Sequence, residues 1–253
     1  MRGLTRLLIG GCLVAAVGAG AFAYFSRPGP PADSGYATPS VVALDPTATP
    51  AESPATLPAA VLLPVPYTDQ APLGNWASKQ HTCEEASLVM VDRYLHGDHS
   101  AGQIDPRTAE QEINRITPWK PAVDLTSVQV GELAKAHLGW AYQVQPADPL
   151  RMREQIALGR PLIIGVRTHG LGNAVYPGYR THYEQPGWSV SHYIVVVGYD
   201  QAGNYVLNDP GITRGHGYHI SYAQLLHAID DLDRAYPNLN SGRVFVVLAP
   251  LAV

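Results

Sequence analysis

The apolar and polar residues divide the chain into three zones. Residues 7–25 form an apolar run interrupted only by glycines, and two arginines precede it. Residues 27–60 consist mainly of Pro, Ala, Thr and Ser with almost no large apolar side chain. From residue 61 onward, apolar residues return with regular spacing, and this stretch is long enough to bury a substantial core. We therefore expect one globular domain over residues 61–253.

The first half of this domain has the spacing of helices. Residues 83–95 carry apolar side chains on more than one face, which predicts a central, buried helix. Further helices are predicted at residues 107–116, 126–137 and 149–158. The last should begin after Asp148 as N-cap, with Pro149 at its first position, and should stop at Gly159.

The second half changes to short apolar runs that are typical of strands. Strands are predicted at residues 162–167, 192–199, 204–207 and 244–248, with a short helix at residues 221–229. The segment Gln201-Ala202-Gly203 indicates a hairpin turn. Helices followed by a mainly antiparallel sheet predict an α+β domain, with a helical N-terminal half packed on the sheet.

The N-terminal zone has the features of an export signal. Arg2 and Arg6 precede the apolar run, and Ala21-Phe22-Ala23 offers small residues for cleavage. An uncleaved run of this length would serve as a signal anchor and tether the chain to the membrane. In both cases the leading arginines predict that the domain lies outside the cytoplasm, with residues 27–60 as an extended linker after a signal of residues 1–26.

The charge balance bears on the partners of the domain. The chain has 17 Lys and Arg against 21 Asp and Glu, a net charge of −4, and no Lys/Arg cluster. This distribution argues against nucleic acid and against an anionic membrane surface as partners.

Cysteine usage points to a nucleophile. The chain has two cysteines; Cys12 lies in the apolar run, so Cys83 is the only thiol of the domain. An unpaired thiol is unusual in an exported protein. At the start of a helix, the partial positive charge of the backbone stabilises a thiolate and lowers its pKa. Glu84 and Glu85 oppose this effect, so the thiolate should depend on a cationic partner.

A nucleophilic cysteine needs a base, a group that orients the base, and donors for the oxyanion. His192 is the preferred base because it begins a rigid apolar strand, although a structural histidine is the simpler interpretation of a single residue. Asp209 or its neighbour Asn208 could orient the ring, and only one of the two should face it. The side chain of Gln70 is a candidate oxyanion donor beside the Cys83 N–H.

Other candidate residues are weaker. Gln80 is closer to Cys83 than Gln70 is, and His81 is a rival base, but a residue just before the helix turns back onto the thiol with difficulty. The pairs His96/His99 and His216/His219 are expected in Gly-containing loops without a third ligand, so we expect no metal site and no cofactor. No Gly-x-Ser-x-Gly elbow is present.

The order Cys83, His192, Asp209 resembles that of the papain-like cysteine peptidases, specifically the C39-like group related to bacteriocin-processing peptidases. Residues 65–70 (VPYTDQ) look like the opening segment of that group, and Cys-Glu-Glu-Ala-Ser at residues 83–87 looks like its nucleophile helix. Residues 192–199 and Asn208-Asp209-Pro210-Gly211 are similar to its histidine strand and its orienting acid. The resemblance implies a papain-like fold, Gln70 as oxyanion donor and Asp209 as orienter.

Two departures from the group stand out: many members have Cys-Gly where this chain has Cys83-Glu84, and the gap between Gln70 and Cys83 is longer than in the transporter-linked enzymes. The chain has no Gly-x-x-x-x-Gly-Lys-Ser/Thr phosphate loop. Processing of leader peptides by a transporter-linked enzyme is therefore not implied.

The predicted activity is thiol hydrolysis of a peptide or protein substrate through an acyl-enzyme on Cys83. Residues 168–190 form a long Gly-, Tyr- and Pro-rich segment between strands, and we expect them to line the substrate cleft. Two alternatives stay open: acyl transfer to an amine, as in transglutaminases, and a surface module that binds a peptide or wall component without cleaving it.

Overall fold

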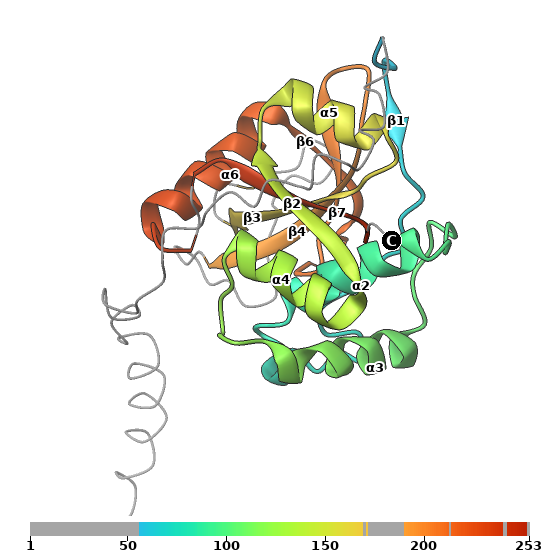
Figure 1. Ribbon diagram of the computed structural model, residues 1–253, viewed down its shortest axis with the longest axis vertical. Coiled ribbons are helices and arrows are strands. Elements are labelled where there is room, and N and C mark those ends of the chain that lie inside the picture. The colour runs from blue at the N-terminus through green and yellow to red at the C-terminus, as the bar shows by residue number, and fades with distance from the viewer. Residues whose placement is uncertain (1–55, 169–170, 172–189, 213, 240–241, 252–253) are drawn as a thin grey trace, which may run out of the picture. The chain divides into compact units, whose positions relative to one another are not determined.

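The computed structural model describes residues 56–168, 171, 190–212, 214–239 and 242–251. They belong to one compact unit, Val41–Val253 (Figure 1). The expected signal or anchor at residues 1–26, most of the linker and nearly all of the segment 168–190 lie outside the described residues.

The described residues form a central seven-stranded sheet. Its strands pair in the order β2-β7-β3-β4-β5-β6, and β1 pairs with β4. All these pairs are antiparallel. The strands are β1 (Val61–Leu62), β2 (Trp140–Pro146), β3 (Leu162–Arg167), β4 (Ser191–Tyr199), β5 (Asn204–Asn208), β6 (His216–Ser221) and β7 (Val244–Pro250). β4 lies between β3 and β1 on one edge and β5 on the other, so its residues are fixed from both sides.

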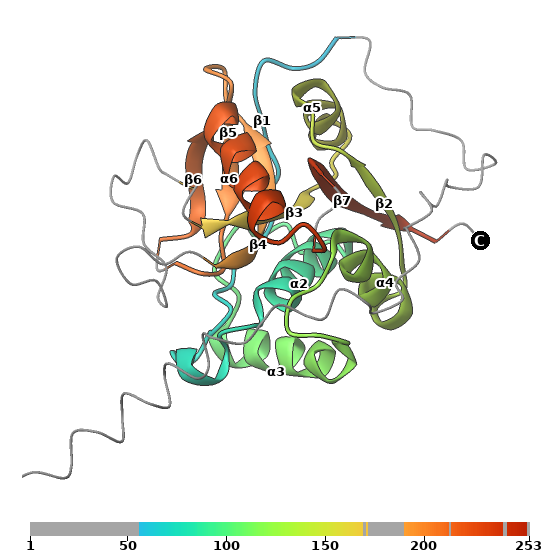
Figure 2. The same cartoon turned by 90° about the vertical axis from the view of Figure 1, so that its left-hand side faces the viewer.

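Helices cover the sheet in layers. They are α2 (Cys83–Leu95), α3 (Pro106–Ile116), α4 (Ser127–Leu138), α5 (Pro149–Ala157) and α6 (Tyr222–Ala235), with short 3₁₀ turns at η1 (Trp76–Ser78) and η2 (Thr117–Trp119). α2 contacts β4, α4 contacts β2 and β7, and α6 contacts β3. α3 lies on the far side of α2 from the sheet (Figure 2). α2 is therefore enclosed between the sheet and another helix.

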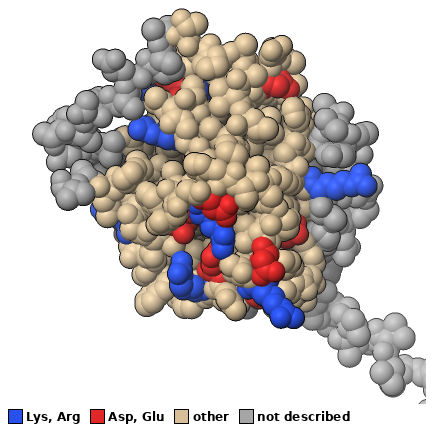
Figure 3. All heavy atoms as spheres, turned by 90° about the vertical axis from the view of Figure 1, so that its right-hand side faces the viewer, with Lys and Arg blue, Asp and Glu red and all other residues tan. Residues whose placement is uncertain are grey.

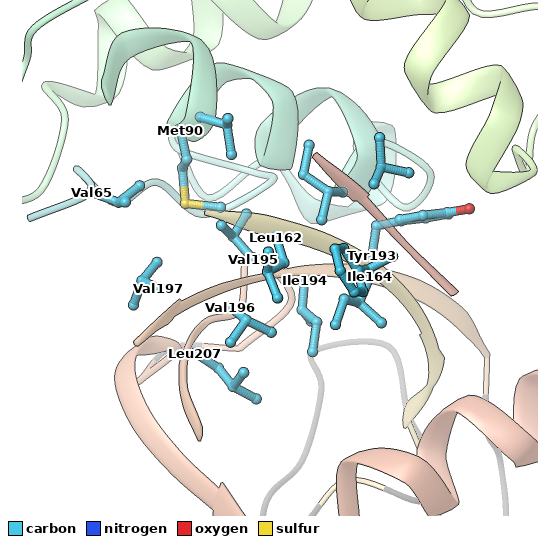
Figure 4. Close-up of a cluster of buried hydrophobic side chains, with 14 of the residues drawn as sticks. Val65, Met90, Leu162, Ile164, Tyr193, Ile194, Val195, Val196, Val197 and Leu207 are labelled. Carbon is cyan, nitrogen blue, oxygen red and sulfur yellow. The ribbon is translucent and has the colours of Figure 1, made fainter. Parts of the chain in front are cut away.

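The core explains why α2 is apolar on more than one face. Residues 83–91 of this helix are all buried. Met90 points from α2 toward Leu162 of β3 and Val195 of β4, whereas Val196 and Leu207 lie beyond the strands from it (Figure 4). Burying such side chains contributes about 1.5–3 kcal/mol each. The resulting packing holds the first turn of α2 in a fixed place relative to β4.

Local signals account for most helix boundaries. Asp148 accepts a hydrogen bond from the Arg151 N–H and caps α5, and Gly159 has φ +77° just after it. Ser221 and Gln224 form a capping box at the start of α6. The prediction for α6 was too short, because this helix continues to Ala235.

Three strands were missed: the two-residue β1 and the longer β2 and β6. β2 follows α4 directly, and its buried residues Trp140 and Tyr142 alternate with half-buried ones, which made the pattern weak. β6 contains Gly217 and two histidines, and its buried residues Tyr218 and Ile220 are too few to stand out. The expectation that His216 and His219 lie in a loop was wrong, because pairing with β5 makes this segment a strand.

Candidate active site

Cys83 is the first residue of α2 and is 6% exposed. Its Sγ donates a hydrogen bond to Glu84 Oε2 at 3.1 Å. Burial and the charge of Glu84 raise the pKa of the Cys83 thiol, while Lys120 and the backbone N–H of Tyr193 act in the opposite direction. The lowering expected from the helix N-terminus does not prevail, because the thiol is buried and a carboxylate adjoins the sulfur.

His192 and Asp209 form a fully buried pair. The His192 Nε2 lies 2.7 Å from Asp209 Oδ1, and both side chains are 0% exposed. Asp209 Oδ1 also accepts from the Gly211 N–H at 2.7 Å, and Oδ2 accepts from the Tyr218 hydroxyl at 3.2 Å. These donors hold the carboxylate in place. The carboxylate in turn determines which ring nitrogen of His192 it contacts.

The loop after β5 brings this pair together. Asp209 follows the last residue of β5, and a Cβ at Gly211 would lie 2.8 Å from Cε1 and Nε2 of His192. A Cβ at Gly215 would lie 1.8 Å from the Asp209 carbonyl oxygen. The loop can therefore approach the ring only with glycine at both positions.

The alternative orienter, Asn208, lies elsewhere. Its Nδ2 donates to the Val65 carbonyl oxygen at 3.3 Å, and its Oδ1 accepts from the Gly217 N–H at 3.1 Å. Asn208 thus joins the segment around Val65 to β6, whereas Asp209 contacts the His192 ring.

Gln70 connects the loop that carries Asp209 to the segment just before α2. Its N–H donates to the Pro210 carbonyl oxygen at 2.9 Å, and its own carbonyl oxygen lies 2.9 Å from the Thr82 hydroxyl. Its side-chain Nε2 donates to the Lys79 carbonyl oxygen at 2.6 Å. Gln70 is 0% exposed, whereas Gln80 and His81 are exposed. The structure therefore brings Gln70, and not Gln80, into contact with both segments.

Residues 62–239 match the family model described as the Peptidase_C39 like family. The chain belongs to this family. The match and the observed helices on an antiparallel sheet confirm the predicted α+β, papain-like fold class.

The solved structures that are similar to this chain include two from bacteria. A protein described as a C39-like peptidase from Bacillus anthracis shares 15% identity over 77% of this chain and 99% of its own, with a TM-score of 0.49. Xylellain, a cysteine protease from Xylella fastidiosa, shares 13% identity over 78% of this chain and 88% of its own, with a TM-score of 0.34. No curated protein matches the chain.

Sequence reasoning missed one charged side chain of this C39-like domain, Lys120. Its Nζ lies 2.9 Å from Glu84 Oε2 and 3.5 Å from Glu85 Oε2, and it also donates to the His81 carbonyl oxygen. Burial alone would lower the pKa of Lys120, but the negative charges of Glu84, Cys83 and Glu85 raise it overall. The signal that could have indicated a buried lysine is the pair Glu84 and Glu85, because two glutamates buried in a helix need a positive charge beside them.

The segment that follows Lys120 joins α2 to β4. Glu84 Oε1 accepts from the Leu125 N–H at 3.2 Å, and the Leu125 carbonyl oxygen accepts from the Tyr193 hydroxyl at 2.9 Å. The Ser191 hydroxyl donates to Asp124 at 2.8 Å. These contacts are made by the sequence neighbours of Cys83 and His192, so this segment ties the start of α2 to the start of β4.

The histidine pairs considered for metal binding have other contacts. His219 lies 2.9 Å from Asp200, and the His216 ring stacks on Tyr67 with centroids 5.2 Å apart. The His96 Nδ1 lies 2.9 Å from the Asp92 carbonyl oxygen, and the His99 ring contacts Tyr94. Within the described ranges, no group of three or more His, Cys, Asp and Glu side chains is arranged to hold a metal ion.

On the face shown in Figure 3, acidic and basic side chains are intermixed and large areas carry no charge. None of the helices in the described part of the chain is both long and apolar enough to span a bilayer.

Proposed function

We propose that this C39-like domain is a cysteine peptidase that cleaves peptide bonds through an acyl-enzyme on Cys83. The observation that carries the proposal is the 2.7 Å contact between the buried side chains of His192 and Asp209, because His192 lies on β4, the strand that packs against the helix beginning at Cys83. A histidine and a carboxylate are the partners that thiol chemistry requires.

The reaction follows from the roles of these groups. Asp209 accepts the Nε2 proton of His192, so proton exchange with the thiol takes place at Nδ1. Cys83 Sγ attacks the substrate carbonyl carbon while its proton passes to Nδ1. The C–N bond then breaks as Nδ1 returns this proton to the leaving amine. Water hydrolyses the thioester, with His192 as general base, and regenerates the thiol.

The oxyanion would be bound by the Cys83 N–H and by Gln70. The amide Nε2 of Gln70 has two protons, and the Lys79 carbonyl oxygen accepts one of them at 2.6 Å. That bond orients the amide and leaves the second proton for the oxyanion. Loss of one such donor costs about 10²–10³ in kcat in enzymes of this kind.

Replacement of the nucleophile tests the proposal. Cys83→Ala should abolish cleavage of a peptide library, read by mass spectrometry, while the protein stays folded by circular dichroism. Ser87→Ala is the matched control, because it removes another buried polar atom one turn along α2, and it should retain cleavage. Equal cleavage by wild type and Cys83→Ala would refute the proposal. Amine acceptors added to the same assay reveal acyl transfer as conjugates.

One observation favours a second candidate, a peptide-binding module without catalysis. The Cys83 thiol is buried, and burial together with the Glu84 charge raises its pKa. A thiol of this kind would alkylate slowly. Failure of iodoacetamide to modify Cys83 at near-neutral pH, together with binding of uncleaved library peptides, would support the module over the peptidase.

We also propose that the domain works outside the cytoplasm, either secreted or tethered by its N-terminal segment. The support is the apolar run behind Arg2 and Arg6. N-terminal sequencing of the protein recovered from cell fractions tests this proposal. A new N-terminus just after Ala23 would indicate a cleaved signal, an intact one in the membrane fraction an anchor, and an intact one in the cytoplasm would contradict export.

A further inference from the structure

Three charged side chains lie buried beside the thiol. The exposed fraction is 6% for the Lys120 side chain, 2% for Glu84 and 0% for Glu85. One oxygen has two donors, because Glu84 Oε2 accepts from Lys120 Nζ at 2.9 Å and from Cys83 Sγ at 3.1 Å. The lysine and the thiol are therefore bound to the same atom.

This sharing has a direct consequence for the nucleophile. A hydrogen bond from the thiol to an ionised carboxylate exists only while the proton stays on sulfur. If the thiol ionised, two negative charges about 3 Å apart would repel each other strongly in a buried site. The positive charge of Lys120, on the same oxygen, offsets that repulsion. Without it the sulfur would lie beside uncompensated carboxylates.

The other groups around Cys83 do not supply this charge. Of the described lysines and arginines, only Lys120 forms an ion pair with Glu84 or Glu85. From β4, Tyr193 contributes its backbone N–H to the sulfur and its hydroxyl to Leu125, and His192 is engaged by Asp209. Asp124 adds a further negative charge near Tyr193.

Glu85 is the third charged member of this group. Burial raises the pKa of its carboxyl, and Oε1 has no hydrogen-bond partner among the described residues. Lys120 Nζ lies 2.9 Å from Glu84 Oε2 and 3.5 Å from Glu85 Oε2, so Glu84 is its nearer partner.

We propose that Lys120 is a positioning residue for the nucleophile: by binding Glu84 it neutralises the carboxylate against which Cys83 must ionise, and Glu84 keeps the resting thiol protonated. The two residues thus act on Cys83 in opposite directions. The inference deepens the proposed peptidase function and rests on it only for its meaning in catalysis, because the ionisation of the thiol is measurable by itself.

The experiment measures the rate at which iodoacetamide alkylates Cys83 of the full chain as a function of pH. Mass spectrometry of the peptide that contains Cys83 separates it from Cys12. Lys120→Met should move the midpoint of the rate profile upward by about one pH unit, which is about tenfold slower alkylation at a fixed pH below the midpoint. Lys120→Arg should restore the wild-type profile.

Two further variants complete the test. Glu84→Gln should move the midpoint downward, because the amide carries no charge, and the double variant with Lys120→Met should lie near wild type. Lys135→Met is the matched control, because Lys135 is exposed on α4, and it should leave the profile unchanged. If Lys120→Met fails to fold, as judged by circular dichroism, Lys120→Gln takes its place, because it keeps a hydrogen-bond donor beside Glu84 without the charge, and it should show the same upward shift.

Unshifted profiles in Lys120→Met and Glu84→Gln, within about 0.3 pH unit of wild type, would overturn the inference. The result is independent of peptide cleavage. Shifted profiles without cleavage of any peptide would uphold the role of Lys120 and refute the peptidase. Cleavage with unshifted profiles would do the reverse.

Discussion

Gly211 offers the sharpest test of the geometry around His192. A methyl group at this position would lie 2.8 Å from Cε1 and Nε2 of the ring, and 3.2 Å from Asp209 Oδ1. Ordinary van der Waals contact begins at 3.4 Å, so the ring would have to move by about 0.6 Å, the difference between the two distances. The ring is 0% exposed and bound to Asp209, so it cannot turn away into solvent.

The magnitude follows from that displacement. Misplacement of a catalytic group by about 1 Å costs about a hundredfold in rate, so Gly211→Ala should lower kcat by about 10-fold to 100-fold. Overpacking of this kind should also lower the free energy of unfolding by about 1–3 kcal/mol. Because the substitution displaces the ring of the proposed base, KM should change much less than kcat.

The assay is steady-state cleavage of a peptide found in the library screen, with urea unfolding measured in parallel. Gly102→Ala is the matched control, because its methyl group would meet only the Ser100 carbonyl oxygen at 3.8 Å. Wild-type kcat in Gly211→Ala, with the protein folded and the control unchanged, would refute the assignment of His192 as the base.

Two predictions concern other polar side chains. Asp209→Asn should lower kcat by about 10²–10⁴, because the charge that orients His192 is lost, whereas Asn208→Ala should cost about 1–2 kcal/mol of stability with little change in kcat; equal kinetic losses would contradict the distinct roles. Burial would raise the pKa of Asp200, but hydrogen bonds from Asn204 and His219 outweigh it and lower this pKa to about 2. Since the folded-state pKa lies below the unfolded value of about 3.9, the stabilisation is complete above that pH and is lost as the pH falls toward 2. Acid titration of stability should therefore flatten in Asp200→Asn by about 1 kcal/mol after solvent screening, and an unchanged curve would contradict this.

Local chemistry made much of the fold predictable. The helix beginning at Cys83, the strand that contains His192 and the cap at Asp148 each depend on side chains within a few positions of one another. Hydrophobic periodicity and capping act over one or two turns, so a single sequence reveals them. The strands without a local signal were missed: β1 has only two residues, β2 pairs with β7, which is distant in the chain, and β6 has only two buried apolar residues.

The sequence by itself determined the lone thiol, the histidine at a strand start and the carboxylate one hairpin later. Tertiary structure decided which neighbour contacts the ring, because the chain leaves β5 at Asn208 and turns only Asp209 toward His192. Tertiary structure also decided which charged side chains lie beside the Cys83 thiol. Lys120 reaches Glu84 across 36 positions, and no local pattern records a contact that depends on the path of the intervening chain.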